Sequence, residues 1–174
     1  MAVISKKICL LGDFSVGKTS LIRRFIEGKF SDQYLTTVGV KISRKSLELD
    51  SPSQTINFIL WDIEGQTKFQ SITPSYLQGA IGAILVGDLT RLETLNNLQK
   101  HLDLFLEINP QGIAIVALNK TDLVDGEKLS KLLEQYSFSK DSNVLASYGT
   151  SAKSGDYVNE MFGQLACHIY QVDN

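Results

Sequence analysis

Hydrophobic and polar positions follow two alternating patterns along this chain. Short apolar runs, typical of buried strands, lie at 8–11, 80–86, 113–118 and, more weakly, 144–147. Apolar residues recur every three or four positions, as on one face of a helix, at 18–28, 92–105, 127–136 and 158–169. Residues 40–49 alternate, and 56–61 resume as a strand after the turn at 51–53, which predicts a β-hairpin.

Strands that alternate with helices of this length favour right-handed βαβ units and an α/β fold. We therefore expect a six-stranded, mostly parallel sheet with about five flanking helices, in which the hairpin supplies one antiparallel edge strand. Ligands bind such sheets at the carboxyl ends of the strands. Each motif described below directly follows a predicted strand, so we expect the motifs to meet at one edge.

Composition fits one ordinary globular domain over 1–174. The chain has 174 residues, of which 43% are hydrophobic and 21% charged. A net charge of −2 gives no electrostatic reason to expect nucleic-acid binding, and no apolar run is long enough for direct membrane insertion. Cys9 and Cys167 lie in apolar patterns, so we expect reduced core thiols in a cytoplasmic, monomeric protein.

Residues 12–19, GDFSVGKT, match the phosphate-loop pattern between a strand and a helix. Glycines allow backbone N–H groups to turn toward a polyphosphate, and the helix start adds its dipole. Lys18 is expected to reach the β- and γ-phosphates, and the Thr19 hydroxyl to ligate Mg²⁺. The alternative is a glycine-rich turn that only joins strand to helix. The expected phosphate contacts are Asp13, Ser15, Val16, Gly17, Lys18, Thr19 and Ser20.

Two later loops, NKTD at 119–122 and TSAK at 150–153, are candidates for base selection. A carboxylate at Asp122 can accept from both N1–H and N2–H₂ of guanine, a donor pair that adenine lacks. Asn119 is expected to brace the loops, the Lys120 stem to cover one base face, and the Ala152 N–H to meet guanine O6. Ser151 and Lys153 complete the expected base site. Taken alone, NKTD is also a plausible polar turn.

The combination of GDFSVGKT, WDIEGQ, NKTD and SAK resembles the Ras superfamily of small GTPases over residues 5–170. Several stretches resemble the Rab branch in particular: TVGV at 37–40, Trp61, DLT at 88–90, and the run FQSITPSYLQG from Phe69 to Gly79. The resemblance implies a P-loop NTPase fold and a molecular switch that binds GTP or GDP with Mg²⁺. It also implies regulation of trafficking or signalling through effectors.

The same resemblance implies roles around the γ-phosphate. Asp62 would hold Mg²⁺ through a water, and Thr37 would complete the metal shell in the GTP state. The Gly65 N–H would bond the γ-phosphate, and Gln66 would orient the attacking water. The catalytic residues would thus be Gln66, Lys18 and Thr37. Phe30 would pack on the guanine and Tyr34 would close over the phosphates, although both are also plausible packing residues.

Effectors, exchange factors and GTPase-activating proteins are the expected partners, contacting 37–42, Trp61 and 69–79. Ile42, Trp61 and Tyr76 match an apolar effector triad of Rab proteins, in which the first position is usually Phe. Trp61 could equally be a sheet residue that its neighbours partly cover. His101 and His168 lie on helical patterns away from the motifs, and no chemistry is expected of them.

Two residues depart from the family pattern. Phe14 stands where Ras proteins have Gly and Rab proteins often Ser, so it is expected to obstruct the Gln66 water or an inserted arginine. Glu64 stands where Ala is usual, and its charge is expected to repel a γ-phosphate and favour GDP. The alternative is that Glu64 turns to solvent or pairs with Lys68. These two residues lead us to expect slow hydrolysis of GTP. The alternative function is a nucleotide-bound scaffold or adaptor with negligible hydrolysis.

The ends of the chain carry no lipidation motif. The sequence ends in YQVDN without a prenylated cysteine, and no Gly follows Met1. Membrane association is therefore expected only if the native full-length protein is lipidated.

Overall fold

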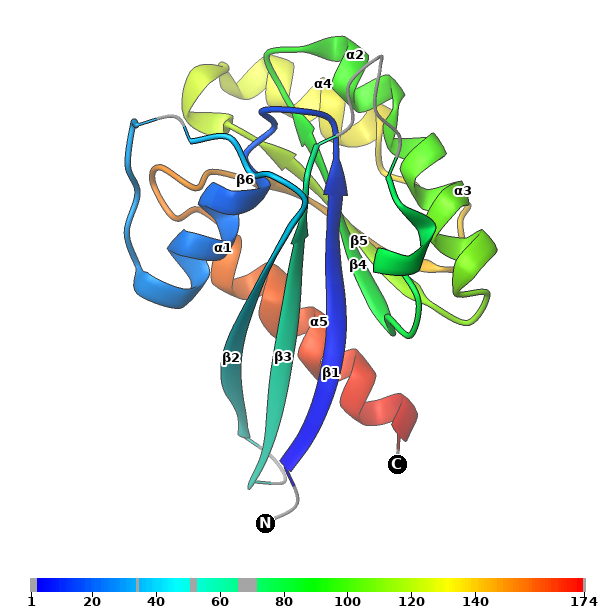
Figure 1. The fold of residues 1–174 in the computed structure, drawn as a ribbon. Helices are drawn as coiled ribbons and strands as arrows, with labels where there is room; N and C mark the ends of the chain where they lie inside the picture. Colours follow the sequence, from blue (N-terminus) through cyan, green and yellow to red (C-terminus); the bar gives the residue numbers. More distant parts are fainter. Residues whose placement is uncertain (1–2, 34, 51–52, 66–71, 174) are drawn as a thin grey trace.

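The computed structural model describes residues 3–33, 35–50, 53–65 and 72–173. Its sheet has six strands in the order β2-β3-β1-β4-β5-β6 (Figure 1). The strands are β1 (Val3–Gly12), β2 (Val40–Asp50), β3 (Ser53–Ile63), β4 (Gly82–Asp88), β5 (Ile113–Asn119) and β6 (Val144–Thr150). Only β2 runs antiparallel to its neighbour, with Val40 opposite Ile63, and the other pairs are parallel. The predicted fold class and edge hairpin are confirmed.

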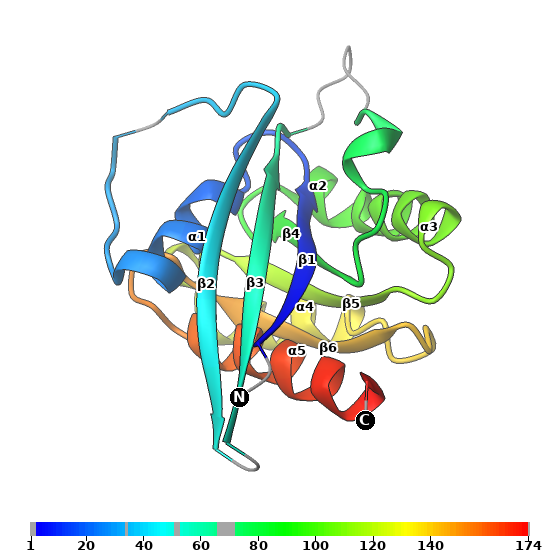
Figure 2. The same cartoon turned by 60° about the horizontal axis from the view of Figure 1, so that its bottom comes forward.

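Helices cover both faces of this sheet (Figure 2). In the described part of the chain they are α1 (Lys18–Glu27), α2 (Leu92–Asn96), α3 (Leu98–Ile108), α4 (Gly126–Gln135) and α5 (Val158–Asp173). One apolar cluster joins α1 and α5 to one face, with Phe25 stacked on Phe162 at 3.9 Å between ring centroids. A second cluster joins α2, α3 and α4 to the other face. Because both faces are covered, all seven residues of the central strand β4 are buried.

Three details differ from the sequence expectations. The helix expected at 92–105 is divided between the short α2 and α3, which meet at Asn97. Strand β1 begins at Val3 rather than at residue 8, because its first half pairs with β3. Cys9 is buried as expected, but Cys167 is exposed, so its assignment to the core was wrong. Cys167 lies on the face of α5 that the sheet leaves uncovered, although its neighbours Leu165, Ala166 and Ile169 are buried.

No helix in the described ranges combines the length and the apolar character that a membrane span requires. The carboxyl ends of β1, β3, β4, β5 and β6 lead into the loops that carry the sequence motifs. These loops gather at one edge of the sheet, at the upper end of the molecule as drawn in Figure 1.

Candidate functional site

The phosphate loop joins the end of β1 to the first turn of α1. Gly17 has φ +104° at the N-terminus of α1, and a Cβ there would lie 2.3 Å from the side-chain nitrogen of Asn119. Only glycine fits so close an approach. Asn119 occupies this space because its amide donates to the Val16 carbonyl over 3.0 Å. The base-selecting loop therefore braces the phosphate loop directly.

Lys18 is enclosed by the loop that it follows. Its ammonium donates to the carbonyls of Gly12 at 3.0 Å and Asp13 at 2.9 Å. The side chain is buried, and burial lowers the pKa of Lys18 to about 8 because a charged amine is poorly solvated there. A polyphosphate bound in the loop would place negative charge beside the Lys18 ammonium and so stabilise its charged form.

Three side chains with oxygen atoms, from three separate segments, meet beside Lys18. The Thr19 hydroxyl donates to Asp62 Oδ2 at 2.5 Å and lies 2.7 Å from the Thr37 hydroxyl. The other carboxylate oxygen, Asp62 Oδ1, is buried and has no hydrogen-bond partner in the described ranges. Burial raises the pKa of Asp62, and this effect outweighs the opposing influence of the Thr19 hydrogen bond and of the nearby Lys18 and Lys41 charges. Neutral and anionic oxygens are the donors that Mg²⁺ prefers, so these residues fit a magnesium ion.

The base-selecting loops meet on the other side of the phosphate loop. Ser151 is buried and donates to Asp122 Oδ1 at 2.7 Å, while Thr150 donates to the side-chain oxygen of Asn119 at 3.2 Å. Lys120 pairs with Asp88 at 2.7 Å and donates to the Ser15 carbonyl at 3.1 Å. These contacts orient Asp122 and Lys120 toward one space.

Arg24, which the motif analysis did not select, holds the last of these loops to α1. Its guanidinium donates to the Ala152 carbonyl at 2.7 Å and also to the Lys153 carbonyl. The two partners are 128 residues apart in sequence, so no local pattern indicates the contact.

A buried polar cluster beneath the phosphate loop corrects one expectation. His101 was expected to lie away from the motifs, but its Nε2 is 2.8 Å from Asp13 Oδ1, and the ring is 1% exposed. Asn97 donates to Asp13 Oδ2 at 2.7 Å. Burial by itself would raise the pKa of Asp13, but these hydrogen bonds outweigh it and lower the pKa. The Asp13 side chain thus fastens the loop to α3, while its carbonyl faces Lys18.

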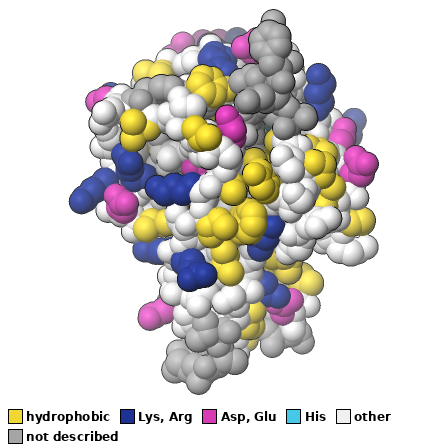
Figure 3. Space-filling view, viewed as in Figure 1, with side chains coloured by type: hydrophobic (Ala, Val, Ile, Leu, Met, Phe, Trp, Pro, Cys, Tyr) yellow, Lys and Arg dark blue, Asp and Glu magenta, His cyan; other side chains and the backbone are white. Residues whose placement is uncertain are grey.

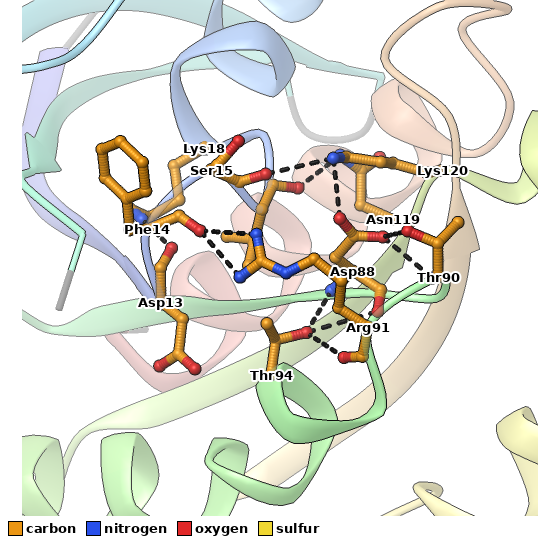
Figure 4. Close-up of polar contacts among 11 residues, drawn as sticks. Asp13, Phe14, Ser15, Lys18, Asp88, Thr90, Arg91, Thr94, Asn119 and Lys120 are labelled. Atoms are coloured by element: carbon orange, nitrogen blue, oxygen red, sulfur yellow. Dashed lines mark hydrogen bonds and ion pairs between the residues drawn. The ribbon is translucent and has the colours of Figure 1, made fainter. Parts of the chain in front are cut away.

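Arg91 is a second side chain that the sequence patterns did not reveal. Both of its terminal nitrogens donate to the Phe14 carbonyl, each at 2.9 Å. Figure 4 shows the guanidinium reaching the phosphate loop from the turn after β4, with the phenyl ring of Phe14 pointing away from it. Thr94 bonds to the Arg91 carbonyl at 2.7 Å and thereby fixes that turn.

A cavity of about 570 Å³ lies among these loops, within the usual range for small-molecule sites. The predicted binding residues that line it are Ser15, Gly17, Lys18, Thr19, Ser20, Phe30, Thr37, Gly65, Asn119, Lys120, Asp122, Ala152 and Lys153. Phe14 also lines it. Four other predicted residues do not line the cavity but contact residues that do: Asp13, Val16, Ser151 and Asp62. Tyr34 and Gln66 lie outside the described residues.

The expected partner surface lies beside this cavity on β2 and β3. Ile42 is 49% exposed and lies opposite Trp61 in the strand register. Trp61 and Tyr76 are 6.4 Å apart between ring centroids, and the Lys7 ammonium covers the Trp61 ring at 3.6 Å. Figure 3 shows hydrophobic side chains gathered on the face over these strands. The triad is therefore contiguous; residues 69–71 of the expected partner surface lie outside the described residues.

The strand–loop–helix geometry, the buried lysine and the converging oxygens define a phosphate-loop nucleotide-binding protein. Comparison with known protein families identifies the family within this class. Residues 7–171 match the model of the Ras family. The chain belongs to the Ras family.

Relatives with Rab names align over most of the chain. It is 33% identical to human Ras-related protein Rab-22A over 175 residues, covering 99% of this chain and 88% of the relative. It is 38% identical to Rab-11B of Dictyostelium discoideum, covering 94% and 73% of the two chains. It is 34% identical to Rab5 of Nicotiana tabacum, covering 94% and 80%. The resemblance to the Rab branch is confirmed.

Proposed function

We propose that this protein, a single G domain over 1–174, is a GTP- and GDP-binding molecular switch that slowly hydrolyses GTP with Mg²⁺. The observation that carries the proposal is the meeting of the Thr19 and Thr37 hydroxyls with the Asp62 carboxylate beside buried Lys18. A metal, when bound there, supplies charge neutralisation between the β- and γ-phosphate oxygens. Membership of the Ras family supports the same activity.

We propose a role for each of the chain's own groups around the phosphates. Lys18 would contact the β- and γ-phosphates, Thr19 and Thr37 would ligate Mg²⁺, and Asp62 would hold it through a water; the contacts among these side chains support this arrangement. The Gly65 N–H binds the γ-phosphate: Gly65 packs against the phosphate loop so closely that a Cβ there would lie 2.5 Å from the Phe14 Cα.

Guanine selection is the role proposed for the second half of the cavity. Asp122 accepts from the base, with Ser151 holding one of its oxygens at 2.7 Å. Lys120 and Phe30 cover the base, Lys153 and the Ala152 N–H complete the pocket, and Tyr34 closes over the phosphates. The decisive test is to denature purified protein and identify the released nucleotide. About one guanine nucleotide per chain is expected, whereas ATP or no nucleotide would remove the proposal.

Hydrolysis is proposed to be slow because Phe14 lines the cavity, where its ring would obstruct the attacking water or an inserted arginine. Gln66 is the residue proposed to orient that water. We predict that Gln66→Leu lowers the single-turnover hydrolysis rate at least about tenfold and leaves GDP affinity nearly unchanged, since the glutamine contacts water. Equal rates in both proteins would exclude a catalytic role for Gln66.

The second candidate function is a nucleotide-bound scaffold with negligible hydrolysis, and Phe14 is the observation that favours it. Single-turnover assays of wild type and Phe14→Gly, with and without candidate activating proteins, separate the two functions. A switch hydrolyses measurable GTP in wild type, whereas a scaffold does so only after Phe14 is removed. In either case, effectors are proposed to bind at 37–42, Trp61 and 69–79, in the cytoplasm or on membranes if the native protein is lipidated.

A further inference from the structure

Glu64 makes a contact that neither sequence interpretation anticipated. Its backbone N–H donates to the Gly39 carbonyl at 2.8 Å, and its side-chain Oε2 accepts from the Gly39 N–H at 3.0 Å. This reciprocal contact extends the β2–β3 ladder one residue beyond Val40 and Ile63. In a regular antiparallel pair the second acceptor would be the Glu64 carbonyl, whereas here the carboxylate takes that place.

The two residues in this contact flank the two segments that surround the γ-phosphate position. Gly39 lies two residues after Thr37, whose hydroxyl is 2.7 Å from Thr19. Glu64 directly precedes Gly65, which packs on the phosphate loop at Phe14. Gly39 has φ +67°, a conformation that favours glycine. The carboxylate therefore ties the Thr37 segment to the Gly65 segment in the arrangement that brings both toward the phosphates.

We propose that Glu64 is a specificity-determining residue that favours the triphosphate state over the diphosphate state. The proposal rests on the proposed guanine-nucleotide switch. With a triphosphate bound, Thr37 and Gly65 would be held inward by their contacts with it, and Gly39 would stay within reach of the carboxylate. When GDP is bound and the Thr37 segment moves away, this charge-assisted hydrogen bond is lost. The hydrogen bond therefore stabilises only the triphosphate-bound state.

This direction is opposite to that of simple charge repulsion between Glu64 and the γ-phosphate. Repulsion depends on the negative charge, so Glu64→Ala and Glu64→Gln would both increase the preference for GTP. The hydrogen bond depends on an acceptor oxygen, which Gln keeps and Ala lacks. The two variants thus separate the two effects by sign.

The experiment measures the ratio of GDP Kd to the Kd of a non-hydrolysable GTP analogue for wild type, Glu64→Ala and Glu64→Gln. We expect Glu64→Ala to lower this ratio about three- to tenfold and Glu64→Gln to lower it less. Glu48→Ala is the matched control, because it removes an exposed glutamate from the same hairpin and should leave the ratio unchanged. Thermal melting checks that each variant is folded.

Amide hydrogen exchange at Gly39 provides a readout that does not depend on affinity. With the GTP analogue bound, the Gly39 N–H should exchange several-fold faster in Glu64→Ala than in wild type or Glu64→Gln. With GDP bound, the three proteins should exchange alike.

A ratio that rises in both Glu64 variants, or stays within twofold of wild type with unchanged Gly39 exchange, would overturn the proposal while leaving the switch intact. Wild-type protein that binds neither nucleotide would overturn the switch and this inference together.

Discussion

Individual side chains determine the shape of the phosphate loop by binding its carbonyl and carboxylate groups. Lys18 binds two of the carbonyls from inside the loop, and Arg91 binds the Phe14 carbonyl from outside. Ser15, with φ +65°, holds a conformation that is unfavourable for a residue with a Cβ, and Lys120 binds its carbonyl. Cationic donors on both sides thus hold a loop that, unlike the usual glycine-rich loop, carries Phe and Ser.

At the scale of one residue, the proposed base selection depends on Asp122. Asp122→Asn should weaken GDP binding at least about tenfold and shift preference toward XDP, because the C2 oxygen of xanthine can accept from an amide. Competition binding with GDP and XDP measures this. Asp103→Asn, an equivalent change on the exposed face of α3, should have no effect. An unchanged GDP preference in Asp122→Asn would show that its carboxylate does not meet the base.

The Arg91 contact predicts an effect on nucleotide release. Arg91→Ala removes both hydrogen bonds to the Phe14 carbonyl, so the phosphate loop should open more often and GDP should dissociate several-fold faster. Arg91→Lys, which can keep one of the bonds, should restore part of the difference. Stopped-flow release of a fluorescent GDP analogue provides the measurement. Identical release rates in all three proteins would mean that the guanidinium contributes nothing to the loop.

At the scale of elements, α3 and α1 act as supports for loops that lie far away in sequence. His101 on α3 and Asn97, which directly precedes α3, hold the Asp13 carboxylate. Arg24 on α1 holds the carbonyls of 152 and 153. Both helices are anchored by apolar faces on opposite sides of the sheet. Helices thus support the phosphate loop and the loop at 150–153, whereas the Thr37 and Gly65 segments are linked to each other by the Gly39–Glu64 contact.

The attachment of α3 to the phosphate loop predicts a pH dependence. The pKa of Asp13 is lowered in the folded protein, so its stabilising effect is fully present above the unfolded pKa of about 4 and is lost as pH falls through the folded pKa. Asp13→Asn should lower the free energy of unfolding by about 1–2 kcal/mol near neutral pH. That difference should shrink below about pH 4. Urea unfolding across this range tests it, and a difference independent of pH would contradict the assignment.

At the scale of the whole molecule, the cavity joins loops from both halves of the sheet. The proposed metal ligands come from α1, β3 and the segment before β2, whereas the loops proposed to bind the base follow β5 and β6. A nucleotide with its metal would therefore connect both halves and stabilise the fold as a unit. Ligands that bind only the folded state raise its stability by mass action.

Chelation of Mg²⁺ should consequently lower the melting temperature of the GDP-bound protein by several degrees, since about 2–3 kcal/mol of linked binding free energy corresponds to such a shift at this size. Thr19→Ala, which lacks the central hydroxyl of the donor set, should melt lower and respond little to chelation. Differential scanning fluorimetry with and without EDTA measures both. A wild-type melting temperature unaffected by chelation would exclude a stabilising metal.

The sequence by itself determined the features that depend on local spacing. Periodicity predicted the strands and helices, because burial on one face imposes a repeat of two or of three to four residues. The motifs at 12–19, 119–122 and 150–153 predicted the cavity wall, because each follows a strand whose carboxyl end lies at one edge of a parallel sheet.

Only the tertiary structure decided which distant side chains support those motifs. His101 reaches Asp13 across 88 residues, Arg91 reaches Phe14 across 77, and Glu64 reaches Gly39 across 25. No repeat or spacing encodes such pairs, since each depends on how two elements pack and on which rotamer the packing leaves available. The sequence showed a negative charge at Glu64 but could not indicate which group forms a hydrogen bond with it. That partner is the backbone N–H of Gly39, and the proposal that Glu64 favours the triphosphate state rests on this contact.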